Sequence, residues 1–415
     1  MTGAGMAGER LSDEALMDLV QRQTLHYFWG FGHPVSGMAR ERSAGSVSYD
    51  VAETVTTGGT GFGIMAMIAG TERGFLPRDA VRERVRKICD FLCKTKHYHG
   101  AFPHWMNGTT GATIAFSTND NGGDLVETAF LMMGLLTARQ YFSEDPALVA
   151  QITAMWHAVE WDAFCPAPNK LMWHWSPDKA WAEGLPITGW HEALITYVLA
   201  ASSPTHPIDV RAYDEGWKNS RTYVNGRSYY GIPLPLGPEL GGPLFFTHYS
   251  FMGLDPRGLH DGHTDYWQQN RNHARINHAY CADNPKGFAG YGAAWGLTAC
   301  DGDRGYNAFS PTNDLGVVAP TGAIAAMPYT PDESLAAMRH YYEDMPGLWG
   351  AFGFYDAFNE TAGWIADSNL AIDEGPIVVM IENHRSGLLW RLFMANPAVA
   401  VGLARVGFKT AAVVA

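Results

Sequence analysis

Cysteine is scarce in this chain of 415 residues, which contains five. None of them belongs to a Cys-x-x-Cys pair, the spacing typical of structural zinc sites and of redox enzymes. The sparse, odd set argues against a disulfide framework and predicts a reduced compartment or incidental free thiols. The cysteines are Cys89, Cys93, Cys165, Cys281 and Cys300.

Positive charge is also in short supply. Lysine and arginine together number 29 against 42 aspartates and glutamates, which gives a formal net charge of −13. No basic run occurs, and affinity for phosphate backbones depends on clustered Lys and Arg, so we expect no nucleic-acid partner. The same deficit argues against adsorption to anionic membranes.

Long hydrophobic runs are missing too. No segment approaches the roughly 20 apolar residues that a membrane-spanning helix needs, so we expect no membrane partner. Residues 1–10 are small and polar, without the apolar stretch of a secretion signal. As the chain stands, this predicts a cytoplasmic protein, and removal of an export signal would make it periplasmic.

Against these absences stands a large apolar and aromatic content. Hydrophobic residues make up 47% of the chain and aromatic residues 13%, with 14 tryptophans. The length and apolar fraction allow a sizeable core. So many aromatic rings suit either an aromatic-rich core or the walls of a sugar-binding cleft, because the C–H face of a pyranose stacks on such rings. Composition alone leaves both interpretations open.

Apolar helical segments alternate with amphipathic ones along the chain. Residues 58–70, 123–142 and 190–201 are apolar around most of their circumference, whereas residues 77–92 and 146–160 carry a single apolar stripe. Alternation of buried and half-exposed helices predicts an all-α protein in which an outer ring of helices wraps an inner ring, an α/α toroid. An irregular helical bundle is the alternative.

The helical pattern fails between residues 204 and 262, where Pro, Gly and Tyr dominate. A long irregular insert is uncommon in a compact domain unless it is functional. We therefore expect a loop with short strands over one mouth of the barrel. No Pro/Ser-rich linker divides the chain, so we predict one domain over residues 1–415.

The densest group of acids lies in residues 119–130. Asp120, Asp124 and Glu127 fall within this stretch, and two adjacent glycines precede an apolar helical run. Asp124 and Glu127 are three residues apart, so they share one face of a helix. Such acids can point into a cavity and form an acid/base site. Alternatively, Asp124 only caps the helix N-terminus.

Three further acids have apolar or aromatic neighbours. Glu192 follows Gly-Trp-His and opens an apolar helix, and Asp373 and Glu374 lie within an apolar run. Desolvation raises the pKa of a carboxyl group in such surroundings, which suits a general acid, while a second, ionised carboxylate can activate water. Glycoside hydrolysis needs this pairing. Capping of helix N-termini is again the alternative.

Other motifs are weak. Residues 58–63 are glycine-rich, but no strand pattern precedes them and no lysine follows, so they fail as a nucleotide-binding loop and predict close helix packing instead. His260 and His263 could suggest a metal, but they lack a fixed ligand frame. We therefore expect neither a metal nor another cofactor.

Several longer motifs resemble those of one known family. They are residues 122–128, 189–192, 203–208, 245–257 and 371–376. These segments look like the bacterial glucoamylase-like proteins, whose characterised branch is glycoside hydrolase family 144, acting on β-1,2-glucans. The resemblance covers nearly the whole chain, from about residue 16 to residue 393.

The resemblance implies a single (α/α)6 barrel and an inverting, metal-independent hydrolysis of β-1,2-glucan or sophorooligosaccharides. By carry-over, Asp120, Asp124, Glu127 and Glu192 match the acids implicated in the family. We predict Glu192 as general acid, because its setting is the most aromatic, and Asp124 as general base, with Asp373 as the next candidate. A related hydrolase acting on a branched or cyclic glucan, and a glycan-binding protein without activity, are the alternatives.

Sugar-binding side chains are expected from the aromatic segments 102–106, 173–175 and 352–355 and from the motifs above. Endo or exo action depends on whether residues 204–262 or 31–49 close one end of the cleft, or whether a neighbouring chain does, since the apolar content leaves room for a homo-oligomer. The predicted substrate-binding residues are His104, Trp105, Trp173, Trp175, Trp190, Phe246, His248, Tyr249, Tyr355 and Glu374.

Overall fold

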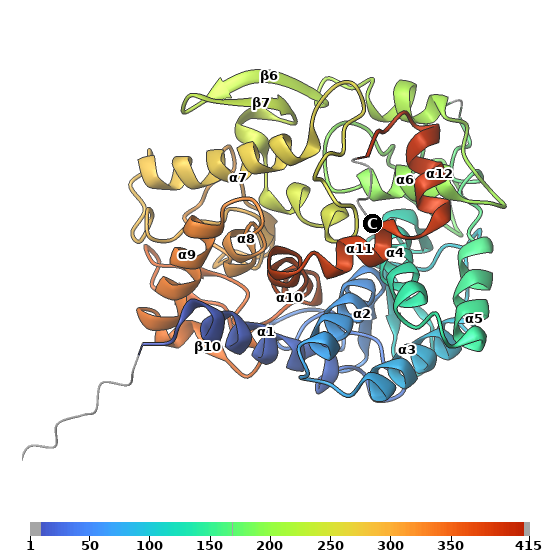
Figure 1. The fold of residues 1–415 in the computed structure, drawn as a ribbon, viewed down its shortest axis with the longest axis horizontal. Coiled ribbons are helices and arrows are strands. Elements are labelled where there is room, and N and C mark those ends of the chain that lie inside the picture. The colour runs from blue at the N-terminus through green and yellow to red at the C-terminus, as the bar shows by residue number, and fades with distance from the viewer. Residues whose placement is uncertain (1–9, 168, 411–415) are drawn as a thin grey trace, which may run out of the picture.

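Helices dominate the computed structural model, which describes residues 10–167 and 169–410. In Figure 1, α10 lies near the middle of the view, and α1, α3, α5, α7, α9 and α12 lie towards the periphery. None of the described helices is both long and apolar enough to cross a membrane. The helices are α1 (Asp13–Trp29), α2 (Thr57–Glu72), α3 (Arg78–Leu92), α4 (Leu125–Tyr141), α5 (Pro146–His157), α6 (Leu194–Ser202), α7 (Tyr266–Asp283), α8 (Pro320–Ile324), α9 (Pro331–Glu343), α10 (Ala371–Arg385), α11 (Leu388–Met394) and α12 (Pro397–Arg405).

The helices form two layers. In the inner layer α2 packs on α4, α4 on α6, and α6 on the 3-10 helix η4 (Ser250–Met252), while α10 packs on α2, α8 and η4. In the outer layer α1 covers α2 and α10, α3 covers α2, α5 covers α4, α12 covers α6, and α9 covers α8. Helix α7 lies against η3 (Leu244–Thr247). This arrangement confirms the α/α toroid predicted from the alternation of apolar and amphipathic segments.

The tightest contact of the inner ring joins α2 and α4. A Cβ atom on Gly61 would overlap the carbonyl oxygen of Phe130, and one on Gly134 would overlap the backbone of Gly61. Glycine at both positions therefore lets the two helices meet backbone to backbone. The glycine-rich residues 58–63 serve close helix packing, as predicted.

The strands are short and pair locally. β1, β2 and β3 form a three-stranded antiparallel sheet, and β4 pairs with β5. The strands are β1 (Thr54–Thr56), β2 (Trp105–Asn107), β3 (Thr113–Ile114), β4 (Gly123–Asp124), β5 (His174–Trp175), β6 (Val224–Tyr229), β7 (Ile232–Leu236), β8 (Ala299–Cys300), β9 (Asn307–Ala308), β10 (Trp349–Gly350), β11 (Gly353–Phe354), β12 (Phe358–Asn359) and β13 (Trp364–Ile365).

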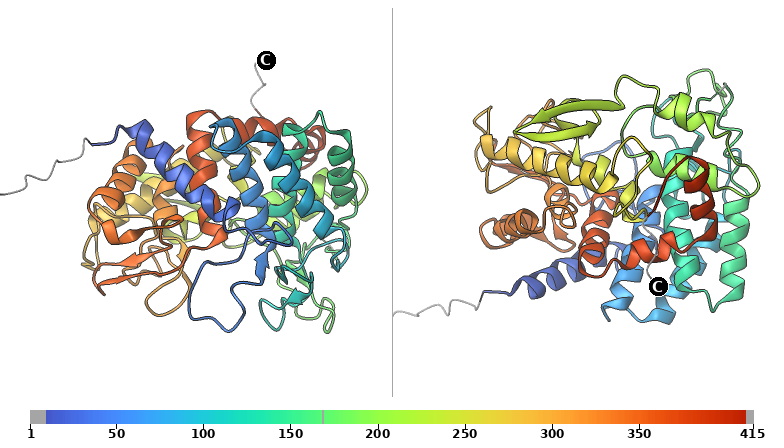
Figure 2. Two further views of the ribbon diagram at one scale, coloured as in Figure 1. Left: turned by 90° about the horizontal axis from the view of Figure 1, so that it is seen from below. Right: turned by 45° about the horizontal axis from the view of Figure 1, so that its top comes forward.

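Residues 204–262 contain the predicted loop with short strands. The hairpin β6–β7 packs on α7 and lies along the outside of the helices (Figures 1 and 2). The later part of the segment turns inward: its 3-10 helix η4 packs against the inner helices α6 and α10, and η3 packs against α7 and η4. The segment is therefore divided between the outer surface and the inner ring.

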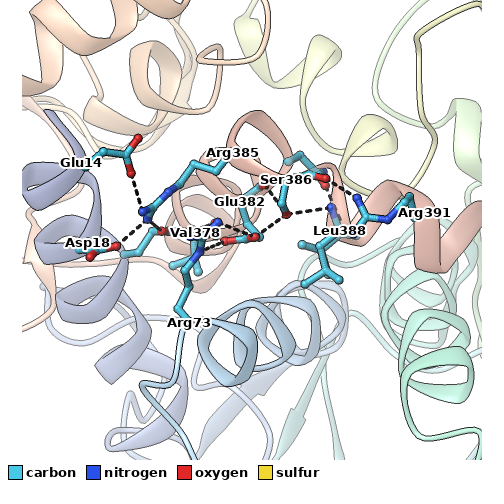
Figure 3. A network of polar contacts seen from close by, with 12 residues as sticks. Glu14, Asp18, Arg73, Val378, Glu382, Arg385, Ser386, Leu388 and Arg391 are labelled. Atoms are coloured by element: carbon cyan, nitrogen blue, oxygen red, sulfur yellow. Dashed lines mark hydrogen bonds and ion pairs between the residues drawn. The ribbon is translucent and has the colours of Figure 1, made fainter.

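A polar network ties the beginning of the described chain to its last inner helix (Figure 3). The carboxylate of Glu382 on α10, 1% exposed, accepts hydrogen bonds from Arg73 on α2, with Nε at 2.6 Å and Nη2 at 3.0 Å. It also accepts a hydrogen bond from Ser386 Oγ at 2.5 Å. On the same helix, Arg385 donates to Asp18 of α1 at 2.6 Å. The ring of helices is closed by contacts between residues about 309 positions apart.

Candidate active site

A cavity of about 350 Å³ collects side chains from many segments of the chain. Its volume lies within the range of small-molecule sites. The cavity is lined by the carboxyl-bearing side chains of Glu41, Glu127 and Glu192. Its aromatic walls include Tyr49, Trp105, Phe116, Trp173, Tyr249 and Tyr306. Acids set among aromatic rings are the combination that the sequence predicted for a sugar-cleaving site.

His104 is the centre of the acid cluster predicted in residues 119–130. Its Nδ1 atom lies 2.9 Å from Oδ2 of Asp120 and 3.1 Å from Oδ2 of Asp124. Its Nε2 atom lies 3.8 Å from Oε1 of Glu127. The structure thus brings the three predicted acids together around one imidazole ring. Within this cluster, His104 and Glu127 line the cavity.

The local fold explains the position of Asp124. Its Oδ1 atom accepts the backbone N–H of Glu127 at 2.8 Å, so Asp124 is the N-cap of α4. Its Oδ2 atom accepts hydrogen bonds from His104 and, at 3.3 Å, from Trp173 Nε1. The side chain is completely buried and does not line the cavity. Asp124, the first candidate for the general base, therefore lies beneath the wall of the cavity.

Glu127 reaches the cavity from the first turn of α4. Its Oε2 atom accepts the backbone N–H of Gly58 at 2.7 Å, at the start of α2. A Cβ atom on Gly58 would lie 2.6 Å from this oxygen, so only glycine leaves room for the carboxylate. The close packing of α2 on α4 therefore also determines the position of the Glu127 carboxylate in the cavity.

Burial and mutual charge set the ionisation of the cluster. Burial raises the pKa of Glu127, although the charge of His104 and the N–H of Gly58 oppose the shift. Burial and the charge of Asp124 likewise raise the pKa of Asp120. Burial alone would lower the pKa of His104, but the charge of Glu127 and the hydrogen bonds to both aspartates outweigh it. The pKa of His104 is therefore well above its ordinary value, and the ring is an imidazolium at neutral pH.

Glu192 lies in the turn before α6, with its side chain 13% exposed to the cavity. Its Oε2 atom is 3.3 Å from Nδ1 of His191. The His191 ring stacks on Trp173, with ring centroids 5.6 Å apart. The backbone carbonyl of Glu192 accepts a hydrogen bond from Ser250 Oγ of η4. Neighbours on three segments therefore hold this acid in place.

A second group of acids is buried apart from the cavity lining. Both carboxyl oxygens of Asp373 lack a hydrogen-bond partner among the described residues. Burial, followed by the charge of Asp356, raises the pKa of Asp373 far above its usual range. Burial and the charge of Asp301 raise the pKa of Asp356 to about 7, and burial raises that of Glu374. Neither Asp373 nor Glu374 lines the cavity, contrary to their predicted places in the site.

Sequence reasoning missed an ion pair on another wall of the cavity. Arg42 Nε lies 2.9 Å from Oε2 of Glu41, and its Nη1 lies 3.0 Å from Oδ2 of Asp301. Tyr49 donates its hydroxyl to Glu41 at 2.5 Å. The sequence predicts segment 31–49 only as a candidate cover for one end of the cleft, and the adjacent Glu41-Arg42 pair is its signal of a polar wall.

The predicted substrate-binding residues divide into two groups. His104, Trp105, Trp173 and Tyr249 line the cavity, and Phe245 lines it where the sequence had suggested its neighbour Phe246. The remaining predicted residues do not line it: Trp175, Trp190, Phe246, His248, Tyr355 and Glu374.

The predicted residues outside the lining have structural partners. Trp190 is buried against Phe251 and Tyr266, and His248 is buried beside His273. Trp175 belongs to β5 and packs against His99 and Tyr98. Tyr355 packs over Gly350 in the β10–β11 turn. These aromatic segments contribute to the core and to loop packing.

The imidazole cluster has the spacing of a cation site. Ligand atoms of His104, Asp120 and Asp124 lie within 4.8 Å of one another. These atoms already form hydrogen bonds with one another, because Nδ1 of His104 is within hydrogen-bond distance of the carboxylates of both Asp120 and Asp124. A cation would have to displace that proton and its hydrogen bonds, so the donor set fits a protonated histidine better than a metal.

Comparison with known proteins gives consistent matches. Residues 184–397 match the family model Glycoamylase, described as "Putative glucoamylase". A solved structure of a "putative glucoamylase" from Bacteroides uniformis is 54% identical, with a TM-score of 0.94, covering 97% of this chain and 99% of that chain. The endo-β-1,2-glucanase from Chitinophaga pinensis, in complex with sophorotriose and glucose, is 48% identical with a TM-score of 0.94 and the same coverage.

A curated relative is larger than this chain. The exo β-1,2-glucooligosaccharide sophorohydrolase (non-reducing end) of Parabacteroides distasonis is 44% identical over 425 residues, covering 95% of this chain. The chain spans 58% of the length of that protein. Because the family model spans more than half of the chain and the solved relatives match it almost end to end, the chain belongs to the Glycoamylase family, the glucoamylase-like proteins that its motifs resemble.

Proposed function

We propose that the protein is a glycoside hydrolase that cleaves β-1,2-glucosidic bonds in β-1,2-glucan or sophorooligosaccharides. The observation that carries the proposal is the cavity itself, where Glu127 and Glu192 lie among aromatic walls. The relatives named for β-1,2-glucan chemistry share 44% and 48% identity with this chain over at least 95% of its length.

Glu192 is the general acid in this mechanism. It lines the cavity, and its carboxyl group is oriented by His191 rather than neutralised by an arginine. A carboxylic acid so placed can protonate the glycosidic oxygen as the bond to the anomeric carbon breaks. The aromatic rings of Trp173 and Tyr249 line the same cavity.

Glu127 is the acid that we assign to water activation. It reaches the cavity, whereas Asp124 lies beneath the wall. Burial raises the pKa of Glu127, and the charge of His104 and the N–H of Gly58 oppose that rise and so favour the ionised form that a general base requires. Asp120 and Asp124 act through His104, by holding its proton and its orientation. Attack of the activated water on the face opposite the leaving oxygen inverts the anomeric configuration.

Asp373 is the second candidate for the base. Its raised pKa, and that of Asp356 nearby, favour a protonated pair at neutral pH, which is a poor proton acceptor. Asp373 would also need a relay to reach water in the cavity, since it does not line it.

A linkage panel tests the proposed function. The protein is incubated with β-1,2-, β-1,3-, β-1,4- and β-1,6-linked glucans, with cyclic β-1,2-glucan and with sophorooligosaccharides, and released sugars are separated by size over time. We expect hydrolysis of the linear β-1,2-linked substrates and initial release of the α-anomer, observed by proton NMR. Turnover confined to another linkage would refute the assignment, and binding of sophorotriose without turnover would make the protein a glycan-binding protein.

A further inference from the structure

Phe116 is an aromatic residue of the cavity for which the sequence carried no signal. It lies in the loop between β3 and β4, and the residue is 50% exposed although it lines the cavity. A large apolar side chain left half in water beside a buried charge cluster is unfavourable in the free protein. What distinguishes Phe116 from other exposed apolar residues is its place in the cavity wall, where a bound ligand can cover it.

One face of the Phe116 ring is already occupied. It stacks on the imidazole of His104, with ring centroids 4.1 Å apart and planes at 5°. The ring of Trp105 meets it edge-on, at 5.0 Å and 75°. A phenyl ring has two faces, so its exposed area is assigned to the face turned away from His104. The pairing of an aromatic face with an imidazolium is itself attractive.

The loop that carries Phe116 is tied to the acid cluster. The backbone N–H groups of Phe116 and Ser117 donate to the carbonyl oxygen of Asp120 at 2.9 and 3.2 Å. In return, the N–H of Asp120 donates to Ser117 Oγ at 3.0 Å. The side chain of the same Asp120 accepts from His104. The position of the Phe116 ring is therefore fixed both by the backbone hydrogen bonds of its loop and by stacking on His104.

We propose that Phe116 is a sugar-stacking platform, which binds one glucosyl ring of the substrate on its free face and is held in place by the ring of His104. This inference rests on the proposed function, because it names a binding residue for that reaction. The C–H face of a pyranose would cover the exposed phenyl face and remove its apolar area from water. Because His104 and Asp120 hold the platform before the sugar arrives, little ordering is needed on binding.

Substitution of Phe116 separates binding from chemistry. Phe116→Ala should raise KM for sophorooligosaccharides about tenfold, the size expected for the loss of one aromatic contact, with kcat changed less than about threefold. Phe116→Trp and Phe116→Tyr keep an aromatic face and should restore KM to within about threefold. Tyr230→Ala is the matched control, because Tyr230 is 45% exposed on the distant β6–β7 turn, and it should leave KM unchanged.

A direct binding measurement keeps this test independent of turnover. Calorimetric titration of sophorotriose into Glu192→Gln, with and without Phe116→Ala, should show the same tenfold weakening. Unchanged affinity and KM in Phe116→Ala, or failure of Phe116→Trp to recover either, would overturn the platform. If the wild-type protein cleaves no β-1,2-linked substrate, the proposed function fails, and the titration still decides whether Phe116 binds the sugar.

Discussion

Nδ1 of His104 lies 3.1 Å from Oδ2 of Asp124, a carboxylate whose other oxygen caps helix α4. The Asp124 side chain thus caps α4 through Oδ1 and contacts His104 in the cavity wall through Oδ2. Conservative and non-conservative substitutions should separate these two tasks.

Asp124→Asn should lower kcat/KM while keeping the N-cap of α4. Asparagine remains a good N-cap, so the loss in the free energy of unfolding should come from the buried contact with His104 alone, about 3 kcal/mol. The charge that holds the proton of His104 is lost, and kcat/KM should fall about tenfold or more, or ~1.4 kcal/mol in the barrier. Asp124→Ala loses the cap as well, and urea unfolding should report a further ~1 kcal/mol. Wild-type kcat/KM in Asp124→Asn would mean that the His104 contact has no part in the reaction.

Glu192→Gln should abolish most turnover of natural substrate without weakening binding. Loss of a general acid costs about 10²–10⁴-fold in kcat. A β-sophoroside with a good phenolate leaving group needs no protonation, so its cleavage by the variant should be affected far less. Equal losses on both substrates would assign Glu192 another role. The comparison requires only initial rates and a calorimetric titration of sophorotriose.

Gly58→Ala should impair activity more than stability. The new Cβ would lie 2.6 Å from Glu127 Oε2, so the carboxylate must turn away from the backbone N–H of residue 58. Alanine stabilises a helix by up to about 1 kcal/mol relative to glycine, which offsets part of the loss. We expect kcat/KM to fall about tenfold and the melting temperature to change little. Gly347→Ala is the control, since its Cβ meets only ordinary contacts.

His248 should make the protein sensitive to mild acid. Burial lowers the pKa of His248 to about 3, and burial lowers that of His273 to about 4. The unfolded chain takes up these protons near pH 6.5, whereas the folded chain resists them, so stability falls as pH drops below 6.5. Each histidine should cost about 2 kcal/mol between pH 7 and pH 5.

The variant His248→Asn should remove one of these contributions. The difference in unfolding free energy between pH 7 and pH 5, measured by urea titration, should shrink by about 2 kcal/mol. KM for sophorooligosaccharides should stay at the wild-type value, since His248 does not line the cavity. An unchanged pH dependence would show that the pKa of His248 is the same in the folded and the unfolded chain.

Glu382→Gln should destabilise the ring of helices without touching the site. Breaking a buried ion pair costs about 3–5 kcal/mol, and because Arg73 is 24% exposed we expect less than that, about 2–3 kcal/mol. Glu382 lies outside the cavity lining, so kcat/KM at 25 °C should be unchanged. Asp209→Asn breaks an exposed pair with Arg211 and should leave stability at the wild-type level. Equal effects of the two variants would contradict the importance of the buried network.

Much of the fold was readable from helical periodicity, because inner helices are apolar all round and outer ones are not. Helix α7 was missed for a physical reason: Gln269, Asn272, His273 and Asn277 are polar yet buried. Their hydrogen-bond partners are backbone groups of residues 233, 236, 242 and 297, which no local pattern reveals. A polar helix face usually indicates exposure to solvent, but the polar face of α7 packs against loops and is buried by them.

The site was predictable where a motif and a helix start coincided. Glu127 lies in the first turn of α4 and Glu192 in the turn just before α6, so the short segments around them determine their direction. Arg42, Phe116 and Tyr306 come from loops whose placement depends on remote packing. His248 was misplaced because adjacent residues of a 3-10 turn point in different directions, so that its neighbour Tyr249 faces the cavity while His248 faces the core.

The contacts of Arg73 with Glu382 have a consequence for how the molecule forms. During synthesis, α2 emerges about 300 residues before its partner on α10, so one apolar flank of α2 stays uncovered until the ring can close. Closure of so long a loop is entropically costly and slow. We therefore expect an intermediate to accumulate during refolding in which the ring is open and the apolar flanks of α2 and α10 are exposed. As protein concentration rises, association of these flanks between different chains would compete with closure of the ring.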